Sequence, residues 1–126
     1  MIVVNGIDII EIDRIRKVAH QYGSRFYSRI YSKFEIDYCN GDPAKLATRF
    51  AAKEAVMKAL GTGVRGVSWK EIEILRQPGR APQVKLHGKA KKHAAEMGIN
   101  HMAVSLSHSE TYAIASVVAQ SQVTND

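Results

Sequence analysis

The sequence has one cysteine and no long apolar segment. Cys39 has no partner for an internal disulfide, which fits a protein of the reducing cytoplasm. No apolar run approaches the roughly 20 residues that a membrane-spanning helix needs. The first ten residues, MIVVNGIDII, lack the basic leader of a signal peptide. We therefore expect a cytoplasmic protein that does not enter a membrane.

Motifs of several common function classes are also missing. One cysteine and five scattered histidines do not make a zinc set, and no GxSxG elbow indicates a serine hydrolase. Gly61-Thr62-Gly63 follows a helical pattern instead of preceding a helix, so it is not a Walker loop. Zinc-finger spacing and RNP aromatic motifs are absent as well, so the sequence gives no specific sign of nucleic-acid binding.

What is present is typical of one folded domain over residues 1–126. Apolar residues make up 45% of the chain and charged residues 24%. The formal net charge is +6. Such a charge favours an anionic partner, which can be a nucleic acid, a phosphorylated metabolite or an acidic protein.

The order of the predicted elements favours an α+β fold, with helices packed on a mainly antiparallel sheet. Strands are predicted at 2–10, 67–77, 82–87, 101–109 and 112–120, a long helix from Pro43 or Ala44 to Leu60, and shorter helices at 14–23, 25–32, after Ser32 and at 88–98. We expect Asp13 to cap the first helix, Ser32 and Glu35 to form a capping box, residues 61–66 to be a loop, and residues 120–126 to be frayed.

The stretch RFAAKEAVMKALGTG, residues 49–63, places a carboxylate where a core residue is expected. Glu54 falls on the apolar side of the predicted helix, and Lys58 lies one turn further on. An ordinary i,i+4 ion pair of about 0.2–0.5 kcal/mol is one explanation. Lys45, Arg49 and Lys53, spaced four apart, form a separate basic stripe.

Asp8 repeats this oddity on a predicted buried strand, facing the same side as Ile10. An ionised carboxylate there is costly unless it is paired or binds a cation, although it can also end the strand by bonding the next turn. Two carboxylates suit Mg²⁺, which completes its shell with water and substrate phosphate. Lys58 and the glycines could then approach phosphate. Spacing alone leaves open whether Asp8 and Glu54 meet.

Three blocks of the chain resemble a known family. NGIDIIEIDRI is similar to the opening motif of the small bacterial holo-[acyl-carrier-protein] synthases, which belong to the 4′-phosphopantetheinyl transferase superfamily. RFAAKEAVMKALGTG matches their central signature, and HMAVSLSHSETYAIASVV their closing segment. The blocks occur in the family's order and cover nearly the whole chain.

The resemblance implies a transferase that moves the phosphopantetheine arm of coenzyme A to a serine of apo acyl carrier protein, as part of fatty-acid synthesis. Asp8 and Glu54 would hold Mg²⁺, or Mn²⁺ in its place, and act in catalysis with Lys58. The implied coenzyme contacts are Arg49, Lys58, Gly61, Gly63 and His108. Taken alone, the serine-rich segment around His108 is better explained as a turn.

The resemblance also implies partners. Arg14, Arg25 and Phe26 would face the acidic carrier protein, and three copies of the chain would form a homotrimer with active sites at the subunit boundaries. The attacking serine comes from the carrier, so the chain needs no nucleophile of its own. The proton acceptor is left open between Glu54 and a metal-bound water. A basic binding module without catalysis is the alternative function.

Overall fold

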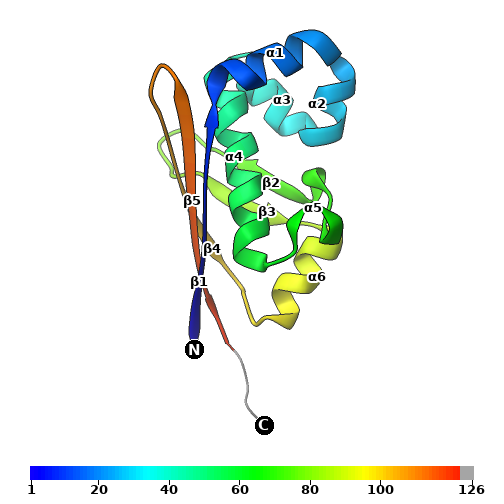
Figure 1. The fold of residues 1–126 in the computed structure, drawn as a ribbon. Coiled ribbons are helices and arrows are strands. Elements are labelled where there is room, and N and C mark those ends of the chain that lie inside the picture. Colours follow the sequence, from blue (N-terminus) through cyan, green and yellow to red (C-terminus); the bar gives the residue numbers. More distant parts are fainter. Residues whose placement is uncertain (123–126) are drawn as a thin grey trace.

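The structure is a computed structural model that describes residues 1–122, except for the side chain of Arg65. Helices pack on a five-stranded antiparallel sheet of order β1-β5-β4-β3-β2, which confirms the predicted α+β class (Figure 1). The strands are β1 (Ile2–Glu11), β2 (Ile72–Leu75), β3 (Gln83–Leu86), β4 (Met102–His108) and β5 (Tyr112–Ser121). The helices are α1 (Ile12–Tyr22), α2 (Ser24–Ile30), α3 (Lys33–Cys39), α4 (Pro43–Leu60), α5 (Gly63–Gly66), the 3-10 helix η1 (Trp69–Glu71) and α6 (Gly88–Glu96).

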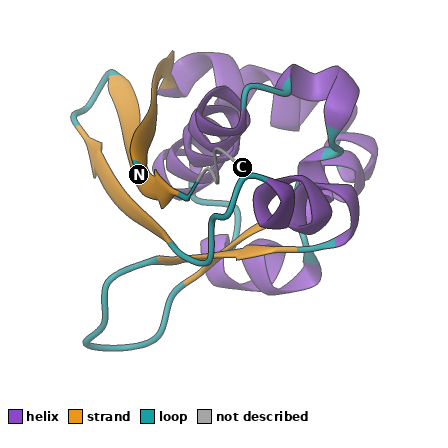
Figure 2. Ribbon diagram, turned by 90° about the horizontal axis from the view of Figure 1, so that it is seen from below, coloured by secondary structure: helices purple, strands orange, loops and turns teal. Residues whose placement is uncertain are grey.

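Helix α4 is the centre of the domain, and its ends follow from local chemistry. The Asp42 side chain accepts a hydrogen bond from the backbone N–H of Ala44 at 2.9 Å, and Pro43 occupies the first helical turn. Gly61 ends the helix in the left-handed conformation, with φ of 72°. The sheet bends around this helix, and the other helices gather on the same side (Figure 2).

Gly6 sets how closely β1 approaches α4. A Cβ atom at Gly6 would lie 1.8 Å from the backbone oxygen of Ala55, so no other residue fits without moving the helix. The facing side of α4 consists of small residues that are fully or almost fully buried, among them Ala51, Ala55 and Ala59. The backbones of strand and helix therefore lie in direct contact.

The helix starts agree in part with the sequence predictions. Ser32 and Glu35 form the predicted capping box, since each side chain accepts a hydrogen bond from the other residue's backbone N–H. The prediction that Asp13 caps the first helix is wrong, because the N-cap of α1 is Glu11. Asp13 lies in the first turn and pairs with Arg16 at 2.9 Å and Lys17 at 3.0 Å.

Residues 61–77 depart from the prediction in two places. The segment expected to be a loop contains the short helix α5, and the first part of the expected strand is η1, so that β2 begins at Ile72. The apolar alternation of Ile72 and Ile74 was correctly interpreted, because both side chains are buried.

The end of β5 is also more ordered than expected. Gln120 and Ser121 pair with Val3 and Ile2 of β1, so the prediction that fraying starts at residue 120 is wrong for these two. Residues 123–126 of the predicted tail lie outside the described residues. Within residues 1–122, no helix combines the length and the apolar character needed to cross a bilayer.

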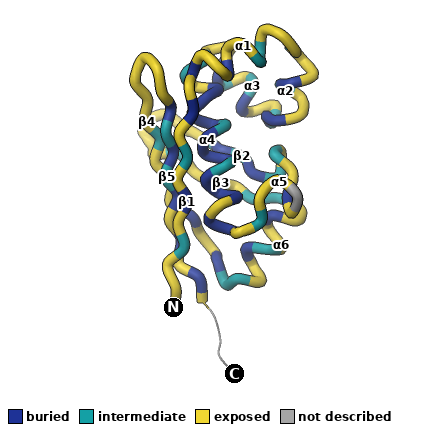
Figure 3. Tube along the Cα trace, viewed as in Figure 1, coloured by how far each residue is buried: buried dark blue, intermediate teal, exposed yellow. Residues whose placement is uncertain are grey.

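The face of the sheet that points away from α4 is exposed, and the exposed positions along β1 and β5 can be followed in Figure 3. On β1 and β5 it carries Val3, Ile7, Ile9 and Val118, whose exposed fractions run from 44% to 63%. Because side chains alternate along a strand, the inward positions of β1 are Gly6, Asp8 and Ile10.

Candidate active site

Asp8 and Glu54, 46 positions apart in the printed sequence, meet between β1 and α4. The Asp8 carboxylate lies close enough to Glu54 to affect the ionisation of that carboxyl group. Burial, followed by the neighbouring Asp8 carboxylate, raises the pKa of Glu54 above its ordinary 4.5, while Lys58 and Arg14 act in the opposite direction. The close approach at Gly6, two residues before Asp8, brings the carboxylates together.

Lys58 belongs to the same group of charges. Its Nζ atom donates to Asp8 Oδ1 at 3.1 Å and to the backbone oxygen of Ile7 at 2.9 Å. Lys58 thus pairs with Asp8 on the strand. A pair with Glu54, one turn before Lys58 on the helix, was the simpler explanation of the sequence. Asp8 is 11% exposed and Lys58 55%, so the ammonium group extends from the carboxylates into solvent.

A cleft of about 290 Å³ opens beside these charges. Its lining consists of Glu54, Met57, Lys58, Gly61, Gly63 and Val64. Gly61 and Gly63 have φ of 72° and 59°, and a Cβ atom at either position would meet nothing within 4 Å. The backbone at the end of α4 is therefore open to a ligand, next to one ammonium group and two carboxylates.

The two carboxylates fit a divalent cation. Among residues 1–122 no group of three or more His, Cys, Asp or Glu converges, so the chain does not form a closed metal cage. Mg²⁺ is often held by one or two carboxylates together with water and substrate phosphate, which is what the open cleft allows. A cation would also offset the repulsion that raises the pKa of Glu54.

Two predicted coenzyme contacts lie away from this cleft. His108 ends β4, exposed, and its neighbour Ala113 on β5 pairs in turn with Ile10 on β1. Two strand spacings, about 10 Å, therefore separate it from β1. Arg49 is buried against α3: Nη1 donates to Thr48 Oγ1 at 3.0 Å, and the guanidinium lies 4.7 Å from the centre of the Tyr38 ring.

Comparison with known proteins assigns the chain to a family. Residues 5–117 match the model of the 4′-phosphopantetheinyl transferase superfamily. The chain belongs to this superfamily. The transferase is 46% identical over 124 residues to a holo-[acyl-carrier-protein] synthase of Koribacter versatilis, covering 95% of this chain and 99% of the relative. It is 48% identical over 115 residues to the synthase of Dehalococcoides mccartyi, covering 91% and 96%.

Solved structures agree with this assignment. The Helicobacter pylori holo-[acyl-carrier-protein] synthase in complex with coenzyme A has a TM-score of 0.84 to the transferase and 35% sequence identity, covering 92% of this chain and 99% of that one. The Neisseria meningitidis enzyme gives the same TM-score, 0.84, and the same identity, 35%, over 93% and 97%.

A second cleft lies between the N-terminal helices and α4 of the transferase. It measures about 520 Å³ and is lined by Val18, Tyr22, Arg25, Phe26, Arg29, Ile30, Phe50 and Trp69. Two predicted carrier contacts, Arg25 and Phe26, thus share one surface. The third, Arg14, is exposed on α1 near Glu54, where its charge lowers the pKa of that carboxyl group.

The sequence predictions missed a buried ion pair. Lys53 was assigned to a basic stripe with Lys45 and Arg49, yet Lys53 and Glu35 both have fully buried side chains, and their charged groups lie 2.7 Å apart. Burial lowers the pKa of Lys53, and the Glu35 carboxylate opposes that shift. No local sequence pattern links Glu35 to Lys53, 18 residues later, so only the capping role of Glu35 could be recognised from the sequence.

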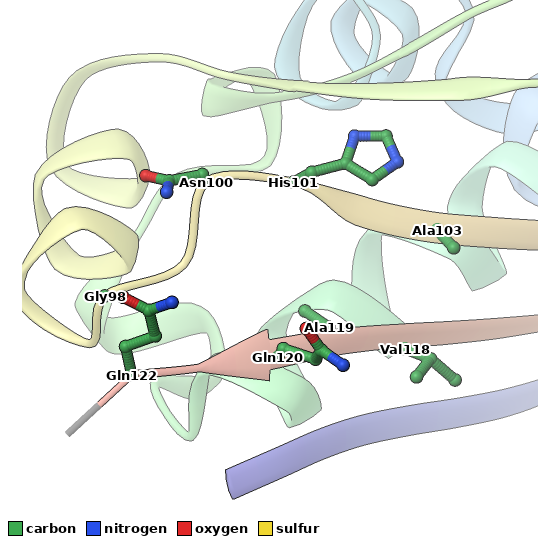
Figure 4. A pocket seen from close by; sticks show the side chains of 8 residues that line it. All are labelled: Gly98, Asn100, His101, Ala103, Val118, Ala119, Gln120 and Gln122. Atoms are coloured by element: carbon green, nitrogen blue, oxygen red, sulfur yellow. The ribbon is translucent and has the colours of Figure 1, made fainter. Parts of the chain in front are cut away.

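A polar pocket at the other end of the sheet contains none of the predicted site residues (Figure 4). It measures about 290 Å³ and is lined by Gly98, Asn100, His101, Ala103, Val118, Ala119, Gln120 and Gln122. It has no carboxylate and no lysine or arginine, so its lining offers little to a metal or a phosphate.

Proposed function

We propose that this transferase moves the 4′-phosphopantetheine group of coenzyme A to a serine of apo acyl carrier protein, in the cytoplasm and in support of fatty-acid synthesis. The observation that carries the proposal is the approach of Asp8 and Lys58 to Glu54, beside the glycine-lined cleft. The names of the relatives and the coenzyme A complex of the Helicobacter pylori enzyme give independent support.

The reaction is a phosphoryl-type transfer. The serine Oγ attacks the phosphorus that carries pantetheine, the bond to the bridging pyrophosphate oxygen breaks, and adenosine 3′,5′-bisphosphate leaves with that oxygen. The serine proton passes to a base. Glu54, which lines the cleft, or a water held by the metal would accept this proton.

The other residues of the cleft bind and neutralise the pyrophosphate. Asp8 and Glu54 would hold Mg²⁺ or Mn²⁺, which would withdraw charge from the phosphate oxygens when bound. The exposed ammonium of Lys58 lies where it can reach the same oxygens while staying on Asp8. The open backbone at Gly61 and Gly63 allows close contact with a phosphate or the pantetheine chain.

The carrier protein would bind over the second cleft. The side chains of Arg25 and Arg29 stand exposed around an apolar floor that includes Phe26, and Arg14 lies between this surface and the carboxylates. An acidic carrier that presents an apolar side chain matches this arrangement, and the net charge of +6 would speed its approach.

A homotrimer would complete the site. The outer face of β1 and β5 exposes four large aliphatic side chains, more than a monomer usually leaves in water, and such a face is typical of subunit contacts. His108 is separated from β1 by two strand spacings in one chain, so it would contact coenzyme bound by a neighbouring copy. The Nη2 atom of Arg49 is buried without a hydrogen-bond partner among the described residues, and a phosphate could satisfy it.

The decisive experiment incubates the protein with coenzyme A, Mg²⁺ and apo acyl carrier protein, and follows the carrier mass. We expect a gain of one phosphopantetheine that stops when a chelator removes the metal. Glu54→Gln should fold and lose at least about 100-fold in turnover. Lys17→Met, an exposed change on α1, is the matched control. No mass gain with several carriers, or full turnover in Glu54→Gln, would contradict the proposal.

A further inference from the structure

Lys53 makes an unusual number of polar contacts for one side chain. Its Nζ atom lies 2.7 Å from Glu35 Oε1 and 2.9, 3.1 and 2.7 Å from the backbone oxygens of Ile30, Trp69 and Ile72, so its three N–H groups are shared among four acceptors. These acceptors come from α2, α3, η1 and the start of β2. One buried ammonium on α4 therefore joins four segments that are separate in sequence.

Glu35 extends the same network on the other side. Its Oε1 accepts from the backbone N–H of Ser32 at 2.8 Å, and its Oε2 accepts from the backbone N–H of Ile74 at 2.8 Å. Every polar atom of the pair is thus engaged, as a fully buried ion pair requires. The pair fixes the position of α3 and β2 relative to α4.

Two of the carbonyls that Lys53 binds belong to residues that line the second cleft. Ile30 ends α2, and Trp69 begins η1. Phe50, one turn before Lys53 on α4, stacks on Trp69 with ring centres 4.7 Å apart and forms the floor. Lys53 itself does not line the cleft, so it acts on the cleft only through the backbone that it binds.

We infer that Lys53 is a positioning residue that sets the width of the carrier-binding cleft between α2 and η1. This rests on the proposed function, in which that cleft receives the carrier protein. The adjacent residue, Glu54, points into the coenzyme site instead. Neighbouring side chains of α4 thus serve the two substrates separately, because consecutive helical residues point about 100° apart.

The test removes the pair while keeping its volume. Lys53→Met alone leaves Glu35 as a buried unpaired charge and can prevent folding, so the main variant is the double change Lys53→Met with Glu35→Gln. Met102→Ala, a buried change on β4 that touches neither cleft, is the control, compared at a matched loss of melting temperature.

We expect the double variant to raise KM for the carrier protein at least tenfold. The KM for coenzyme A and kcat at saturating carrier should stay within threefold of the unmodified chain. A general loss of structure would change both KM values and kcat, and Met102→Ala is the variant that shows such a change. An unchanged carrier KM, or an equal rise in both KM values, would overturn the inference.

A second readout does not depend on catalysis. Trp69 is the only tryptophan of the chain, so its fluorescence reports the cleft directly. Acrylamide should quench it at least twice as strongly in the double variant as in the unmodified chain, with no change in Met102→Ala. Equal quenching in all three proteins would overturn the role of Lys53 in the cleft. If the unmodified chain transfers nothing to a carrier, the proposed function fails, while quenching still decides the role of Lys53.

Discussion

Replacing Gly6 by alanine should separate the two carboxylates of the site without changing either. The added Cβ would lie 1.8 Å from Ala55 O, 2.8 Å from Ala55 C and 3.0 Å from Ala59 N, all backbone atoms that cannot rotate away. An ordinary carbon–oxygen contact is about 3.3 Å, so β1 and α4 would have to move apart by about 1.5 Å.

Overpacking of this kind costs roughly 1–3 kcal/mol, and the cost should lie near the upper end here because α4 is buried along most of its length. For a domain of this size we expect a fall in melting temperature of roughly 10 °C. A misplacement of about 1 Å in a catalytic group can cost about 100-fold in rate, so turnover should fall by at least that factor.

The assay measures melting temperature and carrier modification for Gly6→Ala beside Gly79→Ala. Gly79 lies between β2 and β3 with φ of 73°, and its Cβ would meet nothing within 4 Å, so that change adds backbone strain far from the site. Gly79→Ala should lose some stability and keep its turnover. Full turnover in Gly6→Ala would refute the idea that this contact places Asp8 against Glu54.

Two further predictions concern charge and assembly. In the absence of metal, the raised pKa of Glu54 means that the folded chain binds more protons than the unfolded chain above pH 4.5, so stability falls as pH rises through that window. At pH 7.5 in a chelator, Glu54→Gln should therefore have a higher melting temperature than the unmodified chain. Its free energy of unfolding should be larger by roughly 0.2–1 kcal/mol, a small gain because solvent screens this partly exposed group. At pH 4 the difference should vanish, and the same order of melting temperatures at both pH values would contradict this. Ile7→Asp, at a position that is 60% exposed on the outer face, should convert the proposed trimer to monomers in light scattering, whereas Lys92→Asp on α6 should not; a trimeric Ile7→Asp would contradict the proposed interface.

The sequence predicted well what depends on local chemistry. The bounds of α4 followed from Pro43 and Gly61, and the capping box of Ser32 and Glu35 from their spacing. Asp13 was misassigned because an aspartate suits the first turn of a helix as well as it suits the N-cap.

What could not be predicted depends on contacts between distant segments. Lys58 has a carboxylate one turn before it, yet its partner is Asp8, 50 residues away, because β1 crosses α4 at that point. Lys53 looked like a surface residue by its helical spacing, but α2, α3 and η1 cover that side of α4. The family resemblance named the candidate site residues, and the structure brings one of them, Asp8, close enough to Glu54 to affect its ionisation.

The pairing of β1 with β5 has a consequence for how the protein folds. In the sheet β1 lies at an edge, with β5 as its neighbour, and Asp8 is opposite Ala115. Closing a loop of about 100 residues is slow and entropically costly, so this pairing should form late. Asp8 is among the first residues made on the ribosome, but it reaches its place only after β5 has been synthesised. A partly made chain therefore has the Asp8 carboxylate before β5 is there to hold it in place.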